Sequence, residues 1–247
     1  MPEVRHRRAG TGVPLGSPTL LAETPALAIA PGYDGFAAIP REGGAVGLLI
    51  LPEMFGVTPA MQGAAREFAR AGISTLVPNI FWRSADTGAL TYEGPDRGRA
   101  QDRADRLDAE TVCGDVELAI AALMKRVPAV RCVAALGHCI GGTFAVTALG
   151  RTRLAAAISY YGFRISSLGD RLARLDKPAQ LHYGLADPHI PASEVEAVKA
   201  LARGNPRVEV FEYPGAGHSF CNPNRPMYDE RHARAAHERT LSLLRGL

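Results

Sequence analysis

The sequence has few cysteines, little charge imbalance and no long apolar run, and each shortage excludes a class of protein. Four cysteines lie far apart among 247 residues, which is too few for a disulfide scaffold and lacks the short paired spacing of a zinc site. Basic residues number 28 against 25 acidic ones, with no basic block, so we expect no nucleic-acid partner. Since no apolar run approaches the length of a membrane span, we expect no membrane partner either.

The first 26 residues or so have neither the pattern of a signal peptide nor a hydrophobic period. The basic stretch from Arg5 to Arg8 is followed by Pro14, Pro18 and Pro25, which interrupt any apolar segment. This composition predicts an irregular arm over residues 1–26, ahead of one folded domain over residues 27–247. The scarcity of cysteine and the missing secretion signal indicate a reduced compartment, so we expect a cytoplasmic protein.

The rest of the chain alternates between two kinds of segment, which predicts an α/β fold. Runs that are apolar on both faces suit buried parallel strands, and they are Val46–Leu51, Ile73–Val77, Val130–Leu136, Leu154–Tyr161, Ala179–Tyr183 and Val208–Tyr213. Helix-like segments lie at about 60–71, 103–126, 141–150, 166–174, 192–203 and 226–245. We therefore expect a mostly parallel central sheet with helices on both faces, preceded by a hairpin of residues 27–30 and 35–39. In such sheets ligands bind beyond the carboxyl ends of the strands.

A glycine-rich turn follows the predicted strand that ends at Leu136. Residues 137–142 read Gly-His-Cys-Ile-Gly-Gly and are followed by a helix-like segment. The pattern matches the G-x-S-x-G nucleophile elbow of α/β-hydrolases, with Cys139 in place of serine. A sulfur at a helix N-terminus is favoured as thiolate. The alternative is that Cys139 is a small buried apolar residue and the glycines only permit a tight crossover.

Two later strands each end in a loop with a candidate partner for this cysteine. Asp187 follows the strand that ends at Tyr183, and His218 follows the strand that ends at Tyr213. The order nucleophile, Asp, His is the order of α/β-hydrolases, in which His takes the proton and Asp orients it. In isolation, Asp187 could be a turn former and His218 an exposed loop residue. His182, within a strand, and His189, beside Asp187, are rival bases, and His218 is preferred.

From about Tyr33 to the C-terminus, the chain resembles the dienelactone hydrolases (carboxymethylenebutenolidases). Four motifs carry the resemblance: the elbow at 137–142, Ala-Gly-His-Ser-Phe at 216–220, Pro-Glu-Met-Phe-Gly-Val at 52–57, and Pro-Asn-Ile-Phe-Trp-Arg at 78–83. The resemblance implies that Glu53 contacts the thiol and helps to generate the thiolate. It also implies that the backbone N–H of Met54 joins that of Ile140, the residue after the nucleophile, in an oxyanion hole.

The resemblance further implies how a substrate carboxylate is bound. Arg83 matches a family arginine with this role, for which a guanidinium fork is suited. The second family arginine lies four residues after the histidine, where this chain has Asn222, and Arg225 lies three residues further on. Aromatic residues near strand ends, Phe55, Trp82 and Tyr161, could wall an apolar pocket or pack in the core.

These patterns predict a single-domain α/β-hydrolase that opens a small ester or enol-lactone, carrying a carboxylate, through a Cys-His-Asp triad and an acyl-enzyme. We expect no cofactor and no metal, since no ligand spacing appears. We expect a monomer or a small homo-oligomer. The alternatives are a general carboxylesterase or thioesterase with the same triad, and a binding module whose chemistry has lapsed.

Overall fold

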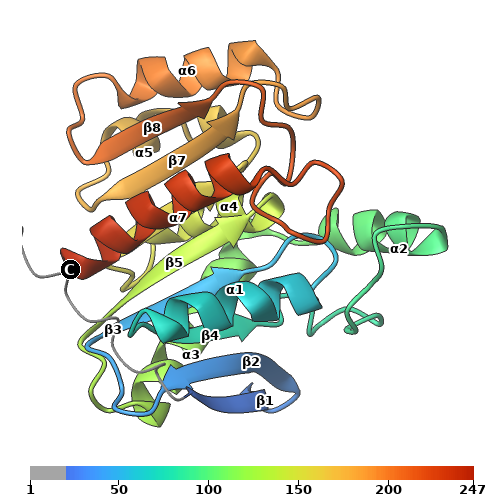
Figure 1. The fold of residues 1–247 in the computed structure, drawn as a ribbon, viewed down its shortest axis with the longest axis vertical. Coiled ribbons are helices and arrows are strands. Elements are labelled where there is room, and N and C mark those ends of the chain that lie inside the picture. Colours follow the sequence, from blue (N-terminus) through green and yellow to red (C-terminus); the bar gives the residue numbers. More distant parts are fainter. Residues whose placement is uncertain (1–20) are drawn as a thin grey trace, which may run out of the picture.

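Eight strands form one sheet in the computed structural model, which describes residues 21–247 (Figure 1). They are β1 (Leu21–Ala30), β2 (Tyr33–Pro40), β3 (Val46–Leu51), β4 (Ser74–Pro78), β5 (Cys132–His138), β6 (Ala156–Tyr160), β7 (Ala179–Gly184) and β8 (Val208–Tyr213). Their order across the sheet is β1-β2-β4-β3-β5-β6-β7-β8. The pairs from β4–β3 onward are parallel, whereas β2 pairs antiparallel with β1 and with β4. This confirms the predicted α/β fold with a mostly parallel sheet.

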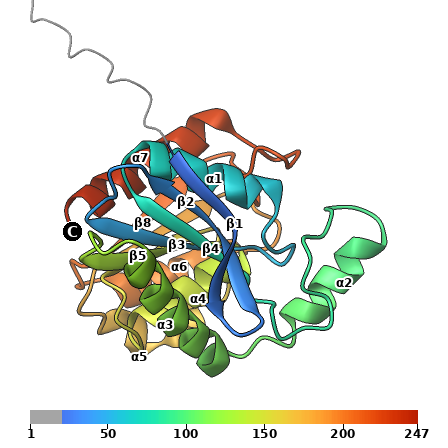
Figure 2. The same cartoon turned by 90° about the horizontal axis from the view of Figure 1, so that it is seen from below.

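Helices cover both faces of the sheet. They are α1 (Pro59–Arg70), α2 (Pro95–Ala104), α3 (Ala109–Arg126), α4 (Ile140–Leu149), α5 (Asp170–Ala173), α6 (Ala192–Ala202), α7 (Glu230–Arg245) and the short 3-10 helix η1 (Ile165–Leu168). In the view from below, α1 and α7 lie on one face, with α3, α4 and α5 on the other (Figure 2). The helix α2 projects to the side of the sheet (Figure 2).

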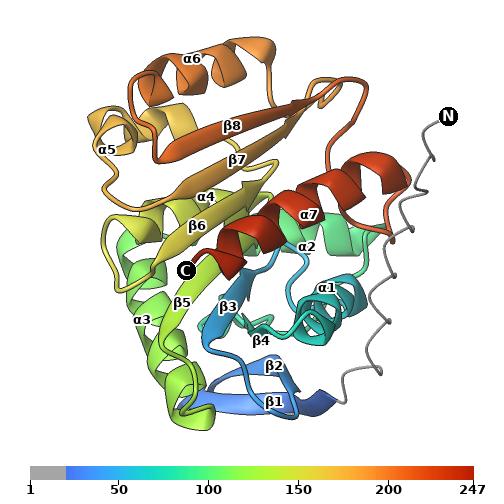
Figure 3. The same ribbon diagram turned by 60° about the vertical axis from the view of Figure 1, so that its left-hand side comes forward.

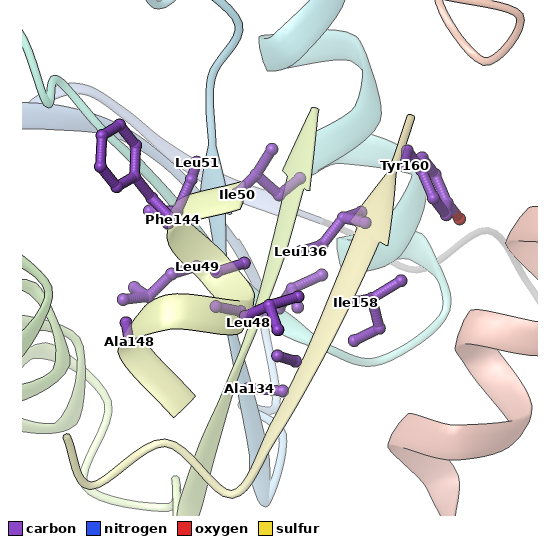
Figure 4. Close-up of a cluster of buried hydrophobic side chains, with 14 of the residues drawn as sticks. Leu48, Leu49, Ile50, Leu51, Ala134, Leu136, Phe144, Ala148, Ile158 and Tyr160 are labelled. Atoms are coloured by element: carbon purple, nitrogen blue, oxygen red, sulfur yellow. The ribbon is translucent and has the colours of Figure 1, made fainter. Parts of the chain in front are cut away.

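The centre of the sheet is apolar on both sides because helices cover both faces. Leu48, Leu49, Ile50 and Leu51 in β3 are fully buried. Their neighbours across the strands include Leu136 in β5, and the close-up shows these side chains packed together with α4 (Figure 4). A continuous apolar run in a strand therefore corresponds here to burial on both faces, as expected for parallel sheets.

The N-terminal boundary of the folded part differs from the prediction. The strand β1 begins at Leu21, so residues 21–26 belong to the sheet rather than to an irregular arm. The register of β1 on β2 shifts between Thr24 and Leu27, around Pro25. Proline is tolerated at an edge strand or a bulge, which explains why it does not end this strand. Residues 1–20 of the predicted arm lie outside the described residues.

Three predicted helices have different limits. The helix predicted at 103–126 is α3, which begins at Ala109, where the Asp108 side chain accepts hydrogen bonds from the N–H groups of Glu110 and Thr111. Residues 103 and 104 instead end α2, a separate helix that was not predicted. The segment at 166–174 is divided into η1 and α5 at Gly169. The last helix starts at Glu230 instead of 226, capped by Asp229. Within residues 21–247, no helix combines the length and the apolar character needed to cross a membrane.

Candidate active site

The nucleophile candidate lies on a sharp turn between β5 and α4, near the middle of the sheet (Figure 3). Cys139 is the N-cap of α4 and has φ 54° and ψ −122°. This positive φ is strained for a residue with a side chain, at a cost of about 1–3 kcal/mol. A Cβ added to Gly137 would lie 2.0 Å from the carbonyl O of Gly141, and one added to Gly141 would lie 2.2 Å from that of Leu51. The two glycines are therefore required by close backbone packing.

The loops after β7 and β8 bring an acid and an imidazole together. His218 Nδ1 lies 2.7 Å from Asp187 Oδ2, and the Asp187 side chain is fully buried. The other carboxylate oxygen of Asp187 accepts a hydrogen bond from the backbone N–H of His189 at 2.8 Å. A carboxylate in this position accepts from Nδ1–H and thus fixes the tautomer and the direction of the ring.

The other side of the His218 ring faces the thiol. Burial disfavours the charged imidazole, but the hydrogen bond with Asp187 and the nearby Cys139 thiol outweigh it and raise the pKa of His218 to about 10. Cys139, His218 and Asp187 thus lie together although they come from three separate loops, with His218 hydrogen-bonded to Asp187 and the thiol beside the ring at the same cavity. The arrangement favours a proton on the imidazole.

A second carboxylate, Glu53, lies just after β3 and is 2 % exposed. Its Oε1 accepts a hydrogen bond of 2.8 Å from Asn222 Nδ2, which also donates to the Tyr92 hydroxyl at 3.0 Å. Burial raises the pKa of Glu53, while the nearby Tyr92 hydroxyl and the charges of Arg225 and His218 act in the opposite direction. Glu53 also contributes to raising the pKa of Tyr92 to about 12, after burial of that hydroxyl.

These groups open onto a cavity of about 670 Å³. The predicted residues that line it are Glu53, Met54, Phe55, Cys139, Ile140, His218 and Arg225. Two arginines that the sequence did not single out, Arg97 on α2 and Arg164 before η1, line it as well. A second cavity of about 620 Å³ lies between α4 and α5, but the thiol and the imidazole face the first one, which is therefore the candidate active site.

Arg83 and Trp82 do not lie at this cavity, contrary to the expectation that they bind substrate. The Arg83 guanidinium forms an ion pair with the buried Asp115 of α3 and stacks on Trp82. The Trp82 indole N–H donates to the same carboxylate at 3.1 Å. In this arrangement the charge of Arg83 compensates a buried carboxylate of the protein itself, away from the cavity that holds Cys139.

Tyr161 is also away from the lining, since it is fully buried beneath His218. Its ring centroid lies 5.1 Å from that of His218, and its hydroxyl is 2.7 Å from Nδ1 of His138. Tyr161 therefore packs against the His218 imidazole from the protein interior. Of the rival bases, His182 is fully buried beside the Tyr213 hydroxyl, and His189 is exposed with its ring 4.9 Å from that of His218.

Two residues that hold Glu53 carried weak signals in the sequence. Asn222 was noted for departing from a family arginine, and Tyr92 lies in an irregular segment between β4 and α2. Asn222 shares the loop after β8 with His218, and Tyr92 lies far from the end of β4, so a position near a strand end did not by itself mark either as a partner of Glu53. Among the described residues, no group of three or more His, Cys, Asp or Glu side chains is arranged to hold a metal ion.

The sheet order, the strained cysteine turn and the loops after β7 and β8 define an α/β-hydrolase. A sequence model of the dienelactone hydrolase family matches residues 33–247, and the chain belongs to that family. It is therefore a hydrolase that acts on ester or enol-lactone substrates.

Individual relatives agree with this assignment. The chain is 29% identical over 224 residues to a carboxymethylenebutenolidase of Pseudomonas putida, and the match covers 87% of this chain and 94% of that protein. It is 26% identical over 225 residues to carboxymethylenebutenolidase 1 of Cupriavidus pinatubonensis, covering 85% and 96%. The structure of a dienelactone hydrolase-like promiscuous phosphotriesterase from metagenomic libraries shares the fold, with a TM-score of 0.75 at 20% identity, covering 94% of this chain and 99% of that one.

Proposed function

We propose that the chain opens a carboxylate-bearing ester or enol-lactone by acyl transfer to Cys139. The observation that carries this proposal is that Cys139 and His218 line one cavity, with the His218 imidazole hydrogen-bonded to the buried Asp187. His218 takes the proton of the thiol, and Asp187 holds the imidazole in place and stabilises its positive charge. The sulfur then attacks the acyl carbon.

Charge that develops on the acyl oxygen needs preorganised donors. The backbone N–H groups of Ile140 and Met54 are proposed for this role, and both residues line the cavity. Arg103 supports the second of these residues, because its Nε donates to the carbonyl O of Met54 at 2.9 Å. This carbonyl belongs to the peptide that follows the Met54 N–H, so Arg103 anchors the loop next to the proposed donor.

Collapse of the tetrahedral intermediate breaks the bond between the acyl carbon and the ester oxygen. The leaving oxygen takes the proton from His218, and an enol released in this way tautomerises to a ketone. Water then attacks the thioester while His218 accepts its proton, and the C–S bond breaks to release the acid and regenerate the thiol. The thiol proton returns from His218, so the cycle consumes one water and leaves the protein unchanged.

Glu53 has a different part in this proposal from the triad members. The family resemblance gives it direct contact with the thiol, whereas here its carboxylate accepts a hydrogen bond from Asn222 and lies close to the Tyr92 hydroxyl. Its negative charge lies near His218 and Arg225, where it lowers the free energy of an imidazolium. We propose that anionic Glu53 favours proton transfer from the thiol to His218.

Arg225 is the proposed contact for a substrate carboxylate. Its guanidinium lies 4.7 Å from the Tyr92 ring centroid and 5.7 Å from that of Phe55, at the wall of the cavity. The two rings hold the charge in place and leave an apolar surface beside it for a planar acyl group. Arg97 and Arg164 add positive charge to the same lining.

A general carboxylesterase or thioesterase is the second candidate. It is favoured by the engagement of Arg83 with Asp115 and by the presence of Asn222 where the family has an arginine. A kinetic comparison of a dienelactone, neutral aryl esters and thioesters separates the two. We expect the highest kcat/KM for the dienelactone. A higher value for neutral esters or thioesters would favour the second candidate, and native turnover by Cys139→Ala would refute both.

A further inference from the structure

We infer that Asn222 and Tyr92 are positioning residues that together hold the Glu53 carboxylate beside the imidazole of the active site. This inference rests on the proposed role of Glu53 and names the groups on which that role depends. Neither residue is proposed to touch the reacting atoms.

Hydrogen bonds of both its side chain and its backbone fix the position of Asn222. It is fully buried, and its Nδ2 donates to Glu53 Oε1 at 2.8 Å and to the Tyr92 hydroxyl at 3.0 Å. Its Oδ1 accepts from the backbone N–H of Asn224 at 2.9 Å, which fixes which end of the amide faces Glu53. The Asn222 backbone N–H donates to the carbonyl O of Ser219 at 2.8 Å. Both amide hydrogens are thus directed at the carboxylate and its second partner.

Tyr92 joins the same network through its hydrogen bond with Asn222. Its hydroxyl accepts from Asn222 at 3.0 Å and donates to Thr58 Oγ1 at 3.4 Å, and from this position it lowers the pKa of Glu53. Its ring packs edge-on against Phe55, with centroids 4.7 Å apart, and the Arg225 guanidinium lies over its face. Segments 130 residues apart in sequence therefore meet at one carboxylate.

The physical need for these donors follows from burial. A carboxylate that is 2 % exposed is disfavoured as an anion unless donors and positive charges compensate the lost hydration. The charged and titratable groups around it are His218 and Arg225 from the segment after β8, Tyr92 from the segment before α2, Cys139 at the start of α4 and Tyr161 after β6. The hydrogen bond from Asn222 and the nearby Tyr92 hydroxyl lower the pKa of Glu53 against the effect of burial.

Loss of these donors shifts the pKa of Glu53 in a defined direction. Without the donors the pKa of Glu53 rises, so the anion is lost at a higher pH as the solution is acidified. If anionic Glu53 supports the reaction, the acid limb of kcat/KM moves to higher pH. A hydrogen bond to a charged group changes an equilibrium by about tenfold or more, which corresponds to about one pH unit.

The experiment compares pH profiles of kcat/KM on a neutral aryl ester, which does not require Arg225. Tyr92→Phe keeps the ring and loses the hydroxyl, and should move the acid limb up by about one pH unit. The nearly isosteric Asn222→Asp keeps an acceptor for Asn224 but replaces the donors with a second carboxyl group beside Glu53, and it should move the limb further, because two carboxyl groups in contact cannot both ionise. Tyr228→Phe, a change in an exposed tyrosine of the same loop, is the matched control and should leave the profile in place.

The double variants identify Glu53 as the group that moves. Glu53→Gln should lower kcat/KM and remove the limb, and Tyr92→Phe should then produce no further shift. If Glu53→Gln is impaired but Tyr92→Phe and Asn222→Asp, folded by circular dichroism, keep the native profile, this inference is wrong while the role of Glu53 stands. If Glu53→Gln itself has the native rate and profile, the proposed role of Glu53 fails first.

Discussion

Replacing Arg225 with Met tests which arginine reads the charge of the substrate. Methionine has a similar length and keeps apolar contact with the Tyr92 and Phe55 rings, over which the guanidinium lies at 4.7 Å and 5.7 Å. The substitution removes every donor and the positive charge. We expect the variant to fold and to lose its preference for anionic substrates.

The size of the effect follows from the strength of a charge-assisted hydrogen bond. Such a bond contributes about 1.5–3 kcal/mol, which is about ten- to a hundredfold in kcat/KM. Arg97 and Arg164 line the same cavity and retain part of the positive potential. The expected loss therefore lies toward the lower end, at about tenfold.

The assay is the ratio of kcat/KM for a carboxylate-bearing lactone to that for its neutral methyl ester. Arg83→Met is the matched control: it removes an arginine outside the cavity, so the ratio should not change. The control should instead lower the free energy of unfolding by about 1–3 kcal/mol, because it leaves the buried Asp115 without its ion-pair partner. A ratio that falls in Arg83→Met and is unchanged in Arg225→Met would reverse the assignment of the two arginines.

Further outcomes concern the triad, the buried histidines and the turn. His218→Ala should lower kcat by about 10⁴ or more in a folded protein, and Asp187→Asn should also be strongly impaired; near-native turnover of either in steady-state assays would exclude this triad. Burial lowers the pKa of both His138 and His182 to about 3, so between about pH 6.5 and 3 the unfolded chain binds more protons than the folded one. Below about pH 6.5 the free energy of unfolding should then fall on acidification by about 1.4 kcal/mol per pH unit for each histidine; equal urea-unfolding energies at pH 6 and 5, a range below the ordinary pKa of histidine in which the raised pKa of His218 no longer opposes the effect, would contradict this. Gly141→Ala should yield little folded protein, because its Cβ would lie 2.2 Å from the carbonyl O of Leu51; a native melting temperature would show that the turn can adjust.

Strand-end reasoning predicted the core of the site because it depends on topology alone. Cys139, Asp187 and His218 each follow a parallel strand, and the carboxyl ends of parallel strands meet at one edge of the sheet. The structure brings these three side chains together. Their chemical roles stay predictions, since proximity is not turnover.

The residues that sequence reasoning misplaced depend on side-chain partners. Arg83 follows β4 as expected, but its partner is Asp115, 32 residues further on and on the buried side of α3. An aspartate within a helical pattern gives no sign that it is buried and needs a cation. The role of Asn222 was equally hard to predict, because its hydrogen bond to Glu53 joins positions 169 residues apart.

The irregular parts of the fold were also hard to predict. Residues between α2 and α3 continue the polar, helix-compatible composition of their neighbours, so the boundary at Asp108 rests on a single capping side chain. The first half of β1 contains Pro25 and is set by pairing with β2 rather than by its own pattern. Tertiary contacts therefore determine where these two elements begin.

The central claim is that Cys139 carries the acyl group, and mass spectrometry of acid-quenched turnover mixtures tests it most directly. Of the other thiols, burial raises the pKa of Cys113, Cys132 and Cys221, which disfavours their thiolates. We predict an acyl adduct during turnover on the peptide that contains Cys139, and loss of both adduct and activity when iodoacetamide alkylates that residue. Inactivation by iodoacetamide with Cys139 unmodified, or full turnover by Cys139→Ala, would contradict the account.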